Sequence, residues 1–274
     1  MTEAANFSSF SSSASSSSST FISMQVEHAV ARITIARPQR RNALDTSCWL
    51  ALSQICDTLA TRADIRVVLL RGEGEHFCAG ADIHELAENI QNTAWLRANQ
   101  SHVADALDRF AALPQPTIAM IRGCCYGGGA ALAISCDFRL AATDSRFAIT
   151  PAKLGLTYRL VDCLRVNQLL GPARAREMLL LAREIDAGTA LEWGLAGEVV
   201  PPERLDECVS ALIEKLLALS GYSQRGIKAT MLKLRDGATR DDDETNQTFD
   251  GAFSGADFAE ATAAFIAKRR PVFS

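Results

Sequence analysis

Short apolar runs in the first half of the chain predict β-strands. Within residues 31–36, Ile33 and Ile35 alternate with polar neighbours, which is the pattern of a strand with one buried face. Residues 67–70 are apolar throughout, as expected of a strand that is buried on both faces. Similar patterns predict further strands at residues 24–28, 117–121 and 137–142.

Helical patterns lie between these strands and dominate the C-terminal part of the chain. Asp45 or Thr46 can cap a helix that runs to about residue 60, because Leu52, Ile55 and Leu59 recur on one face. Further helices are predicted at about residues 93–113, from Gly128 onwards, and at 172–181, 187–193, 202–219, 222–235, 241–253 and 256–268. Strand–helix units recur at intervals of about 40–50 residues, which predicts an α/β fold with a stacked ββα repeat.

The sequence divides into three parts. Residues 8–20 are almost all serine and cannot bury enough apolar surface to offset the entropy of ordering, so residues 1–23 are predicted to form a disordered tail. Residues 1–20 contain no Lys or Arg, which argues against a secretory signal or an organelle transit peptide. Residues 24–200 are expected to form the core and residues 201–274 a helical C-terminal region.

Composition and charge narrow the class of protein. Apolar residues make up 48% of the 274 residues and charged residues 22%, an ordinary balance for a soluble globular protein. The net charge of −4 argues against a broad basic surface for nucleic acid or membrane, and no apolar run approaches the ~20 residues that span a bilayer. The eight cysteines form no Cys-x-x-Cys pair, so a metal site is not expected, and reduced thiols fit a cytoplasmic protein.

Four segments, in this order, resemble those of the enoyl-CoA hydratase/isomerase (crotonase) superfamily. They are residues 37–44 (Arg-Pro-Gln-Arg-Arg-Asn-Ala-Leu), 74–83 (Gly-Glu-His-Phe-Cys-Ala-Gly-Ala-Asp-Ile), 123–137, in which three glycines at 127–129 precede Ser-Cys-Asp, and 265–273. The resemblance covers about residues 24–274 and implies a crotonase-like stacked ββα spiral with a helical C-terminal region. It also implies assembly as trimers or hexamers through that region, and an acyl-CoA thioester substrate with no permanently bound cofactor.

The two glycine-bearing turns of these segments fit acyl-CoA chemistry, in which negative charge develops on the thioester oxygen. Two preorganised N–H donors aimed at that oxygen supply several kcal/mol in a water-poor site. Glycine lets the backbone approach closely, and a helix that begins at Gly128 adds its positive end. By resemblance, the donors are the amides of Ala81 and Gly128. The alternative is that the glycines only make tight turns.

The resemblance also assigns residues to the CoA part of the substrate. Backbone groups of Ala43, Ala79 and Ile83 are expected to lie along the adenine and pantetheine. Arg41, and Lys268 with its basic neighbours, from this chain or from a neighbouring subunit, are expected to meet the CoA phosphates. A solvated helix end is the alternative for the basic cluster at 268–270.

Two positions depart from the hydratase pattern. Typical hydratases carry one glutamate on the helix after the triple glycine and another just before a Lys-Leu-Gly segment, and this chain has Ala131 and Pro151 there. Neither residue can activate water or deliver a proton to the α-carbon. The second glycine-rich turn of hydratases is also missing, because residues 155–159 read Gly-Leu-Thr-Tyr-Arg.

Residues 147–158 are closer to the methylmalonyl-CoA decarboxylase branch, which has Thr-Pro here and a tyrosine at the position of Tyr158. Decarboxylation needs no general base, only an oriented carboxylate, an oxyanion hole and a proton donor. Tyr158 is predicted to orient the carboxylate, with Thr150 as a second hydrogen-bond donor, and the proton donor is left open; Tyr158 can also be an ordinary packed aromatic. That branch has histidine where this chain has Ala81, and it keeps the glutamate replaced by Ala131.

The sequence therefore predicts a lyase that stabilises a thioester enolate, with decarboxylation of a malonyl-type CoA slightly favoured over hydration. The alternatives are an enoyl-CoA hydratase that uses other acid and base groups, and a non-catalytic acyl-CoA-binding protein. The retained oxyanion turns argue against the latter, because binding alone does not require a site for developing charge.

Overall fold

The computed structural model describes residues 21–273. Almost all of the serine-rich tail lies outside this range. Strand β1 (Ile22–Glu27) begins two residues before residue 24, where we expected order to start. The reason is that Ile22 is buried and pairs with Ile35 in the neighbouring strand.

The fold is built on a six-stranded sheet with the order β1-β2-β3-β4-β6-β9. All neighbouring strands are parallel except the first pair, which is antiparallel. The remaining strands are β2 (Val30–Ile35), β3 (Val67–Gly72), β4 (Thr117–Ile121), β6 (Phe138–Ala142) and β9 (Glu198–Val200). The strands predicted from hydrophobic pattern are confirmed to within a few residues.

A second, smaller sheet has the order β5-β7-β8 and was not predicted. Its strands are β5 (Cys124–Tyr126), β7 (Arg146–Ala148) and β8 (Ile185–Asp186). Strands of two or three residues are too short to show a hydrophobic period, and tertiary contacts alone place them. This sheet matters for the site because β5 leads directly into the glycine turn at 127–129.

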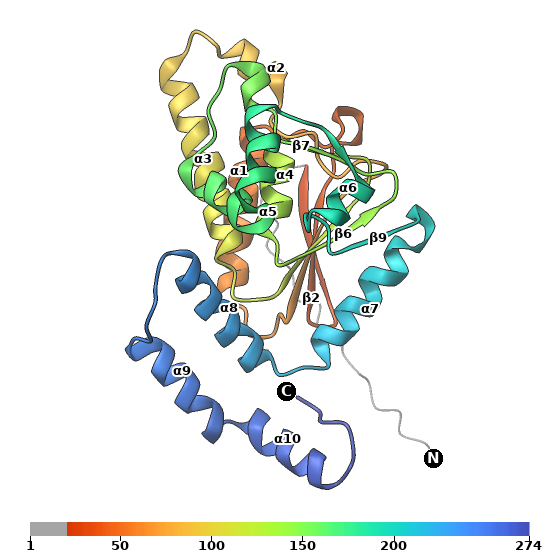
Figure 1. Cartoon of the computed structure of the whole chain (residues 1–274), viewed down its shortest axis with the longest axis vertical. Coiled ribbons are helices and arrows are strands. Elements are labelled where there is room, and N and C mark those ends of the chain that lie inside the picture. The colour runs from red at the N-terminus through yellow and green to blue at the C-terminus, as the bar shows by residue number, and fades with distance from the viewer. Residues whose placement is uncertain (1–20, 274) are drawn as a thin grey trace, which may run out of the picture.

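Helices cover both faces of the large sheet (Figure 1). The main core lies on the face covered by α1 (Thr46–Ala60), α3 (Thr93–Ala111), α4 (Gly128–Ser135) and α5 (Leu160–Leu180). The other face packs a second apolar cluster against α7 (Leu205–Leu217). Strand β3 serves both clusters, because Leu70 faces the first and Leu69 the second. This explains why residues 67–70 are apolar throughout.

Shorter elements complete the body of the molecule. They are η1 (Pro38–Arg40), α2 (Ile83–Glu88), η2 (Pro151–Leu154), α6 (Ala187–Glu192) and η3 (Pro202–Arg204). Helix α5 is interrupted at Gly171, whose φ of 74° and ψ of 164° are not helical, so its second half is the helix predicted to begin at residue 172.

The last three helices form an arm that extends away from the sheet (Figure 1). This C-terminal arm consists of α8 (Gly221–Arg235), α9 (Asp243–Ser254) and α10 (Ala256–Ile266). Lys228 fastens α8 to the body, since its Nζ donates to the Gln115 carbonyl at 2.8 Å and to Asp137 Oδ2 at 2.6 Å. The α/β architecture and the helical C-terminal region are thus confirmed. Among the described residues, no helix is long and apolar enough to cross a bilayer.

The two leucines of α1 give a test of the core. Leu52 is 1% exposed and Leu50 is 41% exposed. We expect Leu52→Ala to lower the free energy of unfolding by ~2–5 kcal/mol, because it leaves a cavity in the main core. Leu50→Ala should cost less than about 1 kcal/mol. Denaturant unfolding measures both variants, and equal losses would contradict this assignment of the core.

Candidate active site

The two glycine-bearing turns meet at van der Waals contact. Gly80 has a φ of +95°, and a Cβ there would lie 2.8 Å from the Tyr126 carbonyl oxygen and 3.1 Å from the Gly128 nitrogen. A Cβ on Gly129 would lie 2.5 Å from the Cys78 carbonyl oxygen. Real Cβ contacts are not this short, so no side chain fits at either position. Close backbone approach therefore requires both glycines.

The amides of Ala81 and Gly128 lie near each other where these turns meet. A Cβ built on Gly128 would lie 3.7 Å from the Ala81 nitrogen and 3.1 Å from the ring of Trp49. Within residues 21–273, neither amide donates a hydrogen bond. Gly128 is the first residue of α4, so its N–H is one of the amides that a helix leaves unpaired at its N-terminus. The arrangement is suited to an oxygen that carries negative charge.

The loop that follows β2 runs alongside the first turn. Leu44 donates to the Gly80 carbonyl at 2.7 Å, and Asp82 donates back to the Leu44 carbonyl at 2.9 Å. The Ala79 amide donates to the Arg41 carbonyl at 2.9 Å. This pairing brings together four residues that were predicted to bind CoA: Arg41, Ala43, Ala79 and Ile83.

Lys268, the fifth predicted CoA residue, lies elsewhere. It follows α10 at the end of the C-terminal arm, which Figure 1 shows far from α1 and α2. The guanidinium of its neighbour Arg269 is already paired within the chain, since it donates to both carboxylate oxygens of Glu260. Within one chain, Lys268 does not join the other four residues.

Arg37 connects the loop after β2 with the turn that carries Ala81. Its Nη1 donates to the Ala43 carbonyl at 2.7 Å and lies 3.2 Å from Asp45 Oδ2, while its Nη2 donates to Asp82 Oδ2 at 2.9 Å. The other oxygen of Asp82 accepts from the His84 amide and caps α2, as an Asx-type turn does.

Asp45 is an ionised carboxylate in this cluster. Burial alone would raise its pKa, but hydrogen bonds from Ser47 and Cys48, together with the charge of Arg37, lower the pKa below its usual value. Asp45 also caps α1 through the Cys48 amide, as expected from the sequence.

Thr150 and Tyr158 lie on the segment that follows β7. The Thr150 Oγ1 would be 3.5 Å from a Cβ on Gly127, so Thr150 adjoins the second turn. The Tyr158 ring packs against the main core. Its hydroxyl oxygen is buried and has no hydrogen-bond partner among the described residues. Burial, followed by the nearby charge of Asp162, raises the pKa of Tyr158, so its phenol is neutral.

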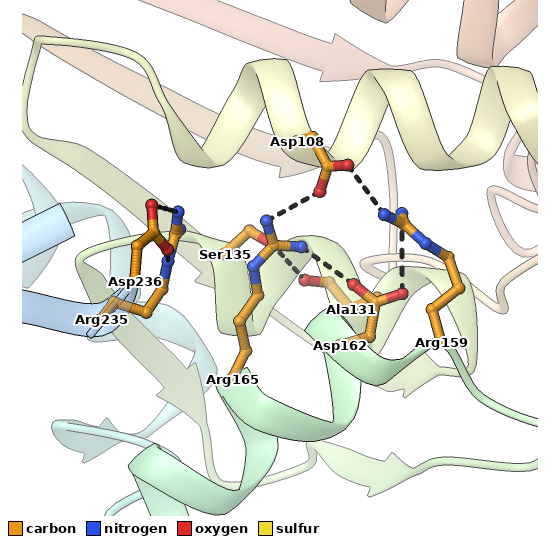
Figure 2. A network of polar contacts seen from close by, with 8 residues as sticks. All are labelled: Asp108, Ala131, Ser135, Arg159, Asp162, Arg165, Arg235 and Asp236. Atoms are coloured by element: carbon orange, nitrogen blue, oxygen red, sulfur yellow. Dashed lines mark hydrogen bonds and ion pairs between the residues drawn. The ribbon is translucent and has the colours of Figure 1, made fainter. Parts of the chain in front are cut away.

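A partly buried ionic network lies between α3 and α5 (Figure 2), and its Asp162 is close enough to act on Tyr158 by its charge. Arg165 donates to Asp162 and to Asp108, each at 2.9 Å, and Arg159 donates to Asp108 at 2.7 Å. Burial raises the pKa of Asp162, whereas the charges of Arg159 and Arg165 oppose this shift. Asp162 is therefore held in ion pairs with both arginines.

Ala131 and Pro151 stand where typical hydratases carry glutamates, and neither brings a carboxylate to this region. Ala131 is buried one turn into α4, and its carbonyl accepts from Ser135 Oγ (Figure 2). Pro151 begins η2. Of the acidic residues near the turns, Asp82 is bound to Arg37 and Glu85 accepts from the Thr46 amide at 2.9 Å. His84 is exposed. The described part of the chain holds no cluster of three or more metal-ligating side chains.

Sequence reasoning missed two features of this region: the Arg37 contacts and the ring of Trp49 beside Gly128. In the sequence, Arg37 stands out only as the first residue of the 37–44 segment. An arginine beside a proline carries no sign of its partners, because Asp82 lies 45 residues away in the sequence.

Comparison with known proteins agrees with the resemblance seen in the sequence. Residues 25–274 match the family model described as enoyl-CoA hydratase/isomerase. The mitochondrial Delta(3,5)-Delta(2,4)-dienoyl-CoA isomerase of Dictyostelium discoideum is 30% identical over 89% of this chain and 87% of its own length. The short-chain-enoyl-CoA hydratase of Clostridium acetobutylicum is 30% identical over 90% of this chain and 95% of its own.

Solved structures confirm the crotonase fold. An enoyl-CoA hydratase/carnithine racemase from Magnetospirillum magneticum superposes with a TM-score of 0.88 at 35% identity, covering 94% of this chain and 96% of that one. The enoyl-CoA hydratase from Bacillus anthracis gives a TM-score of 0.84 at 31% identity, covering 92% and 98%. Neither these relatives nor the family model supports the narrower assignment to the methylmalonyl-CoA decarboxylase branch.

The buried phenol of Tyr158 gives a test by alkaline titration. A free phenol ionises near pH 10, and we expect Tyr158 to remain neutral there, because burial raises its pKa. The difference in tyrosinate absorbance between the native protein and Tyr158→Phe should be absent near pH 10. Tyr126→Phe is the control: burial and a hydrogen bond to Glu184 raise the pKa of Tyr126 to about 12, so the difference between the native protein and this variant should appear near pH 12. A difference signal for Tyr158 near pH 10 would show that its hydroxyl is solvated.

Proposed function

Because this chain belongs to the enoyl-CoA hydratase/isomerase family, we propose that it is an acyl-CoA enzyme that stabilises a thioester enolate between the amides of Ala81 and Gly128. One observation carries the proposal. Two amides lie near each other where the turns touch, and neither donates a hydrogen bond within residues 21–273. Donors fixed in this way need no reorganisation when charge develops on the thioester oxygen.

The CoA part of the substrate follows the loop that is paired with the first turn. Backbone groups of Ala43, Ala79 and Ile83 bind the adenine and pantetheine, and Arg41 meets a phosphate. Lys268 takes part only from a neighbouring subunit, because it lies apart from the other residues in its own chain. The protein needs no permanently bound cofactor for this chemistry, since its own amides stabilise the enolate.

Hydration and isomerisation, the reactions named for the relatives, both require a proton to move at the acyl chain. Ala131 and Pro151 cannot move it. The neutral phenol of Tyr158, which has no hydrogen-bond partner among the described residues, is our candidate proton donor. Thr150 Oγ1, beside Gly127, is a second hydrogen-bond donor to the acyl group.

Decarboxylation of a malonyl-type CoA is a second candidate, and a specific observation favours it. Asp82, Glu85 and Asp162 are all bound to other groups, so none is a free general base. Cleavage of the bond to the carboxylate needs no base, because its electron pair passes into the enolate as CO₂ leaves. A proton from Tyr158 then reaches the α-carbon, and solvent returns a proton to the phenolate.

A screen of acyl-CoA esters by mass spectrometry tests these proposals. Crotonyl-CoA, a dienoyl-CoA, malonyl-CoA and methylmalonyl-CoA distinguish hydration, isomerisation and decarboxylation by their products. We expect Gly128→Ala to lower kcat by about 10²–10³-fold, because the added methyl would lie 3.7 Å from the Ala81 nitrogen, beside the proposed position of the oxyanion. Gly188→Ala in α6 is the matched control, since its Cβ meets nothing closer than 3.7 Å. Tyr158→Phe should lower kcat with little change in ester binding.

The possible outcomes separate the candidates. Full activity in Gly128→Ala would exclude the oxyanion hole, and full activity in Tyr158→Phe would exclude Tyr158 as the proton donor. Tight thioester binding with no turnover of any ester would favour a non-catalytic acyl-CoA-binding protein.

We further propose that the chain assembles as a homo-trimer or hexamer through the C-terminal arm. Large apolar side chains are exposed along the arm in the single chain: Ile227, Met231, Leu234, Phe249, Phe253, Phe258, Phe265 and Ile266. Cavities of about 540 and 620 Å³ remain on either side of α8, so the arm is incompletely packed. Exposed apolar surface of this extent favours association with further copies.

Phe253 is the best position to test this assembly. Its ring stacks edge-to-face on Phe249 at 5.4 Å and on Phe258 at 5.7 Å, and it is 60% exposed. We expect light scattering to show trimers or hexamers for the native protein and smaller species for Phe253→Asp. Leu181→Asp, at an exposed apolar position on the body, is the control. A monomeric native protein would refute the proposed assembly.

The cytoplasm remains our proposed location. All eight cysteines are free, which fits a reducing compartment. The relative from Dictyostelium discoideum is mitochondrial, so fractionation of cells is the direct test.

A further inference from the structure

We propose that Arg37 is a positioning residue that couples binding of the CoA moiety to the alignment of the Ala81 amide. The inference rests on the proposed function, because it assigns the loop after β2 to CoA and Ala81 to the oxyanion. Arg37 itself touches neither the acyl group nor the thioester. It acts through the two segments that its guanidinium joins.

The contacts of Arg37 link two segments that lie apart in the sequence, residues 43–45 and the turn that contains Asp82. Nη1 donates to the Ala43 carbonyl in the loop after β2 and lies 3.2 Å from Asp45 Oδ2, just before α1. Nη2 binds Asp82, which directly follows Ala81 and caps α2. The side chain of Arg37 is 12% exposed, and those of Asp45 and Asp82 are 17% and 8% exposed. Water therefore competes little for these contacts.

The charge and the planar shape of the guanidinium explain why this position requires arginine and not lysine. One guanidinium lies between two partly buried carboxylates, so its removal leaves two like charges without a cation between them. The planar guanidinium reaches Ala43, Asp45 and Asp82 with fixed donors. A lysine ammonium is a point charge on a flexible stem and does not reproduce this geometry.

These contacts provide a path from the remote part of the substrate to the reacting carbonyl. CoA bound along Ala43 contacts the segment whose Ala43 carbonyl accepts a hydrogen bond from Arg37. Arg37 also donates to Asp82, which directly follows the Ala81 amide. The Leu44 pairing with Gly80 and Asp82 joins the same two segments through backbone hydrogen bonds. Binding energy from a remote part of a substrate is useful in catalysis only when it improves geometry at the reacting centre.

Infrared difference spectroscopy of a bound thioester tests this coupling directly. Butyryl-CoA and S-butyryl-N-acetylcysteamine, each labelled with ¹³C at the carbonyl, differ only in the CoA part. In the native protein we expect the carbonyl stretch to move to lower wavenumber, and further for the CoA ester than for the truncated ester. In Arg37→Lys this difference between the esters should disappear. For the ester that the screen identifies, kcat should fall about 10–100-fold, with a smaller change in KM.

Controls separate positioning from general stability. Arg62→Gln removes an exposed arginine paired with Asp64 and should leave the spectra unchanged. If Arg37→Lys does not fold, Asp82→Asn carries the same test, because the amide oxygen can still cap His84 while the charge pair is lost. A variant with lower thermal stability but an unchanged difference between the esters would overturn the proposal. No carbonyl shift for either ester in the native protein would instead overturn the oxyanion hole itself.

Discussion

The contact between the two glycine turns is the constraint on which the rest of the site depends. A side chain at Gly80 or Gly129 would collide with backbone atoms at 2.8 Å or less, so the turns can touch only if both positions lack a Cβ. That contact brings the amides of Ala81 and Gly128 near each other, with Gly128 at the start of α4. Strand β5 of the small sheet leads into the second turn, the ring of Trp49 lies beside Gly128, and Arg37 binds the first turn through Asp82.

Backbone donors and acid–base side chains are separable parts of this site. The amides are set by turn geometry, and they persist whatever side chains surround them. The groups that move protons depend on individual side chains, and here Ala131 and Pro151 remove the two carboxylates of the hydratase pattern. Tyr158 offers a neutral phenol in a buried setting, where the nearest acid, Asp162, is neutralised by arginines. This division explains why enolate stabilisation is better supported than any single reaction.

The fold was largely predictable where the hydrophobic pattern is long and regular. The strand at Thr117–Ile121 and the helix at Thr46–Ala60 were predicted at or near their observed bounds, because each has a clear period or a capping residue. The three strands of the small sheet could not be predicted, since two or three residues carry no period. The start of β1 was placed two residues late, because the pairing of Ile22 with Ile35 is a tertiary contact.

By itself, the sequence determined the α/β class, the two glycine turns and the absence of glutamate at Ala131 and Pro151, since residue identity and local pattern are enough for these. Only the tertiary structure decided how the parts meet. It joined Arg37 to Asp82 across 45 residues, left the Tyr158 hydroxyl without a described partner, and separated Lys268 from the loop after β2 of its own chain. The physical reason is that hydrogen bonding and burial depend on distances between remote segments, and a local pattern does not contain those distances.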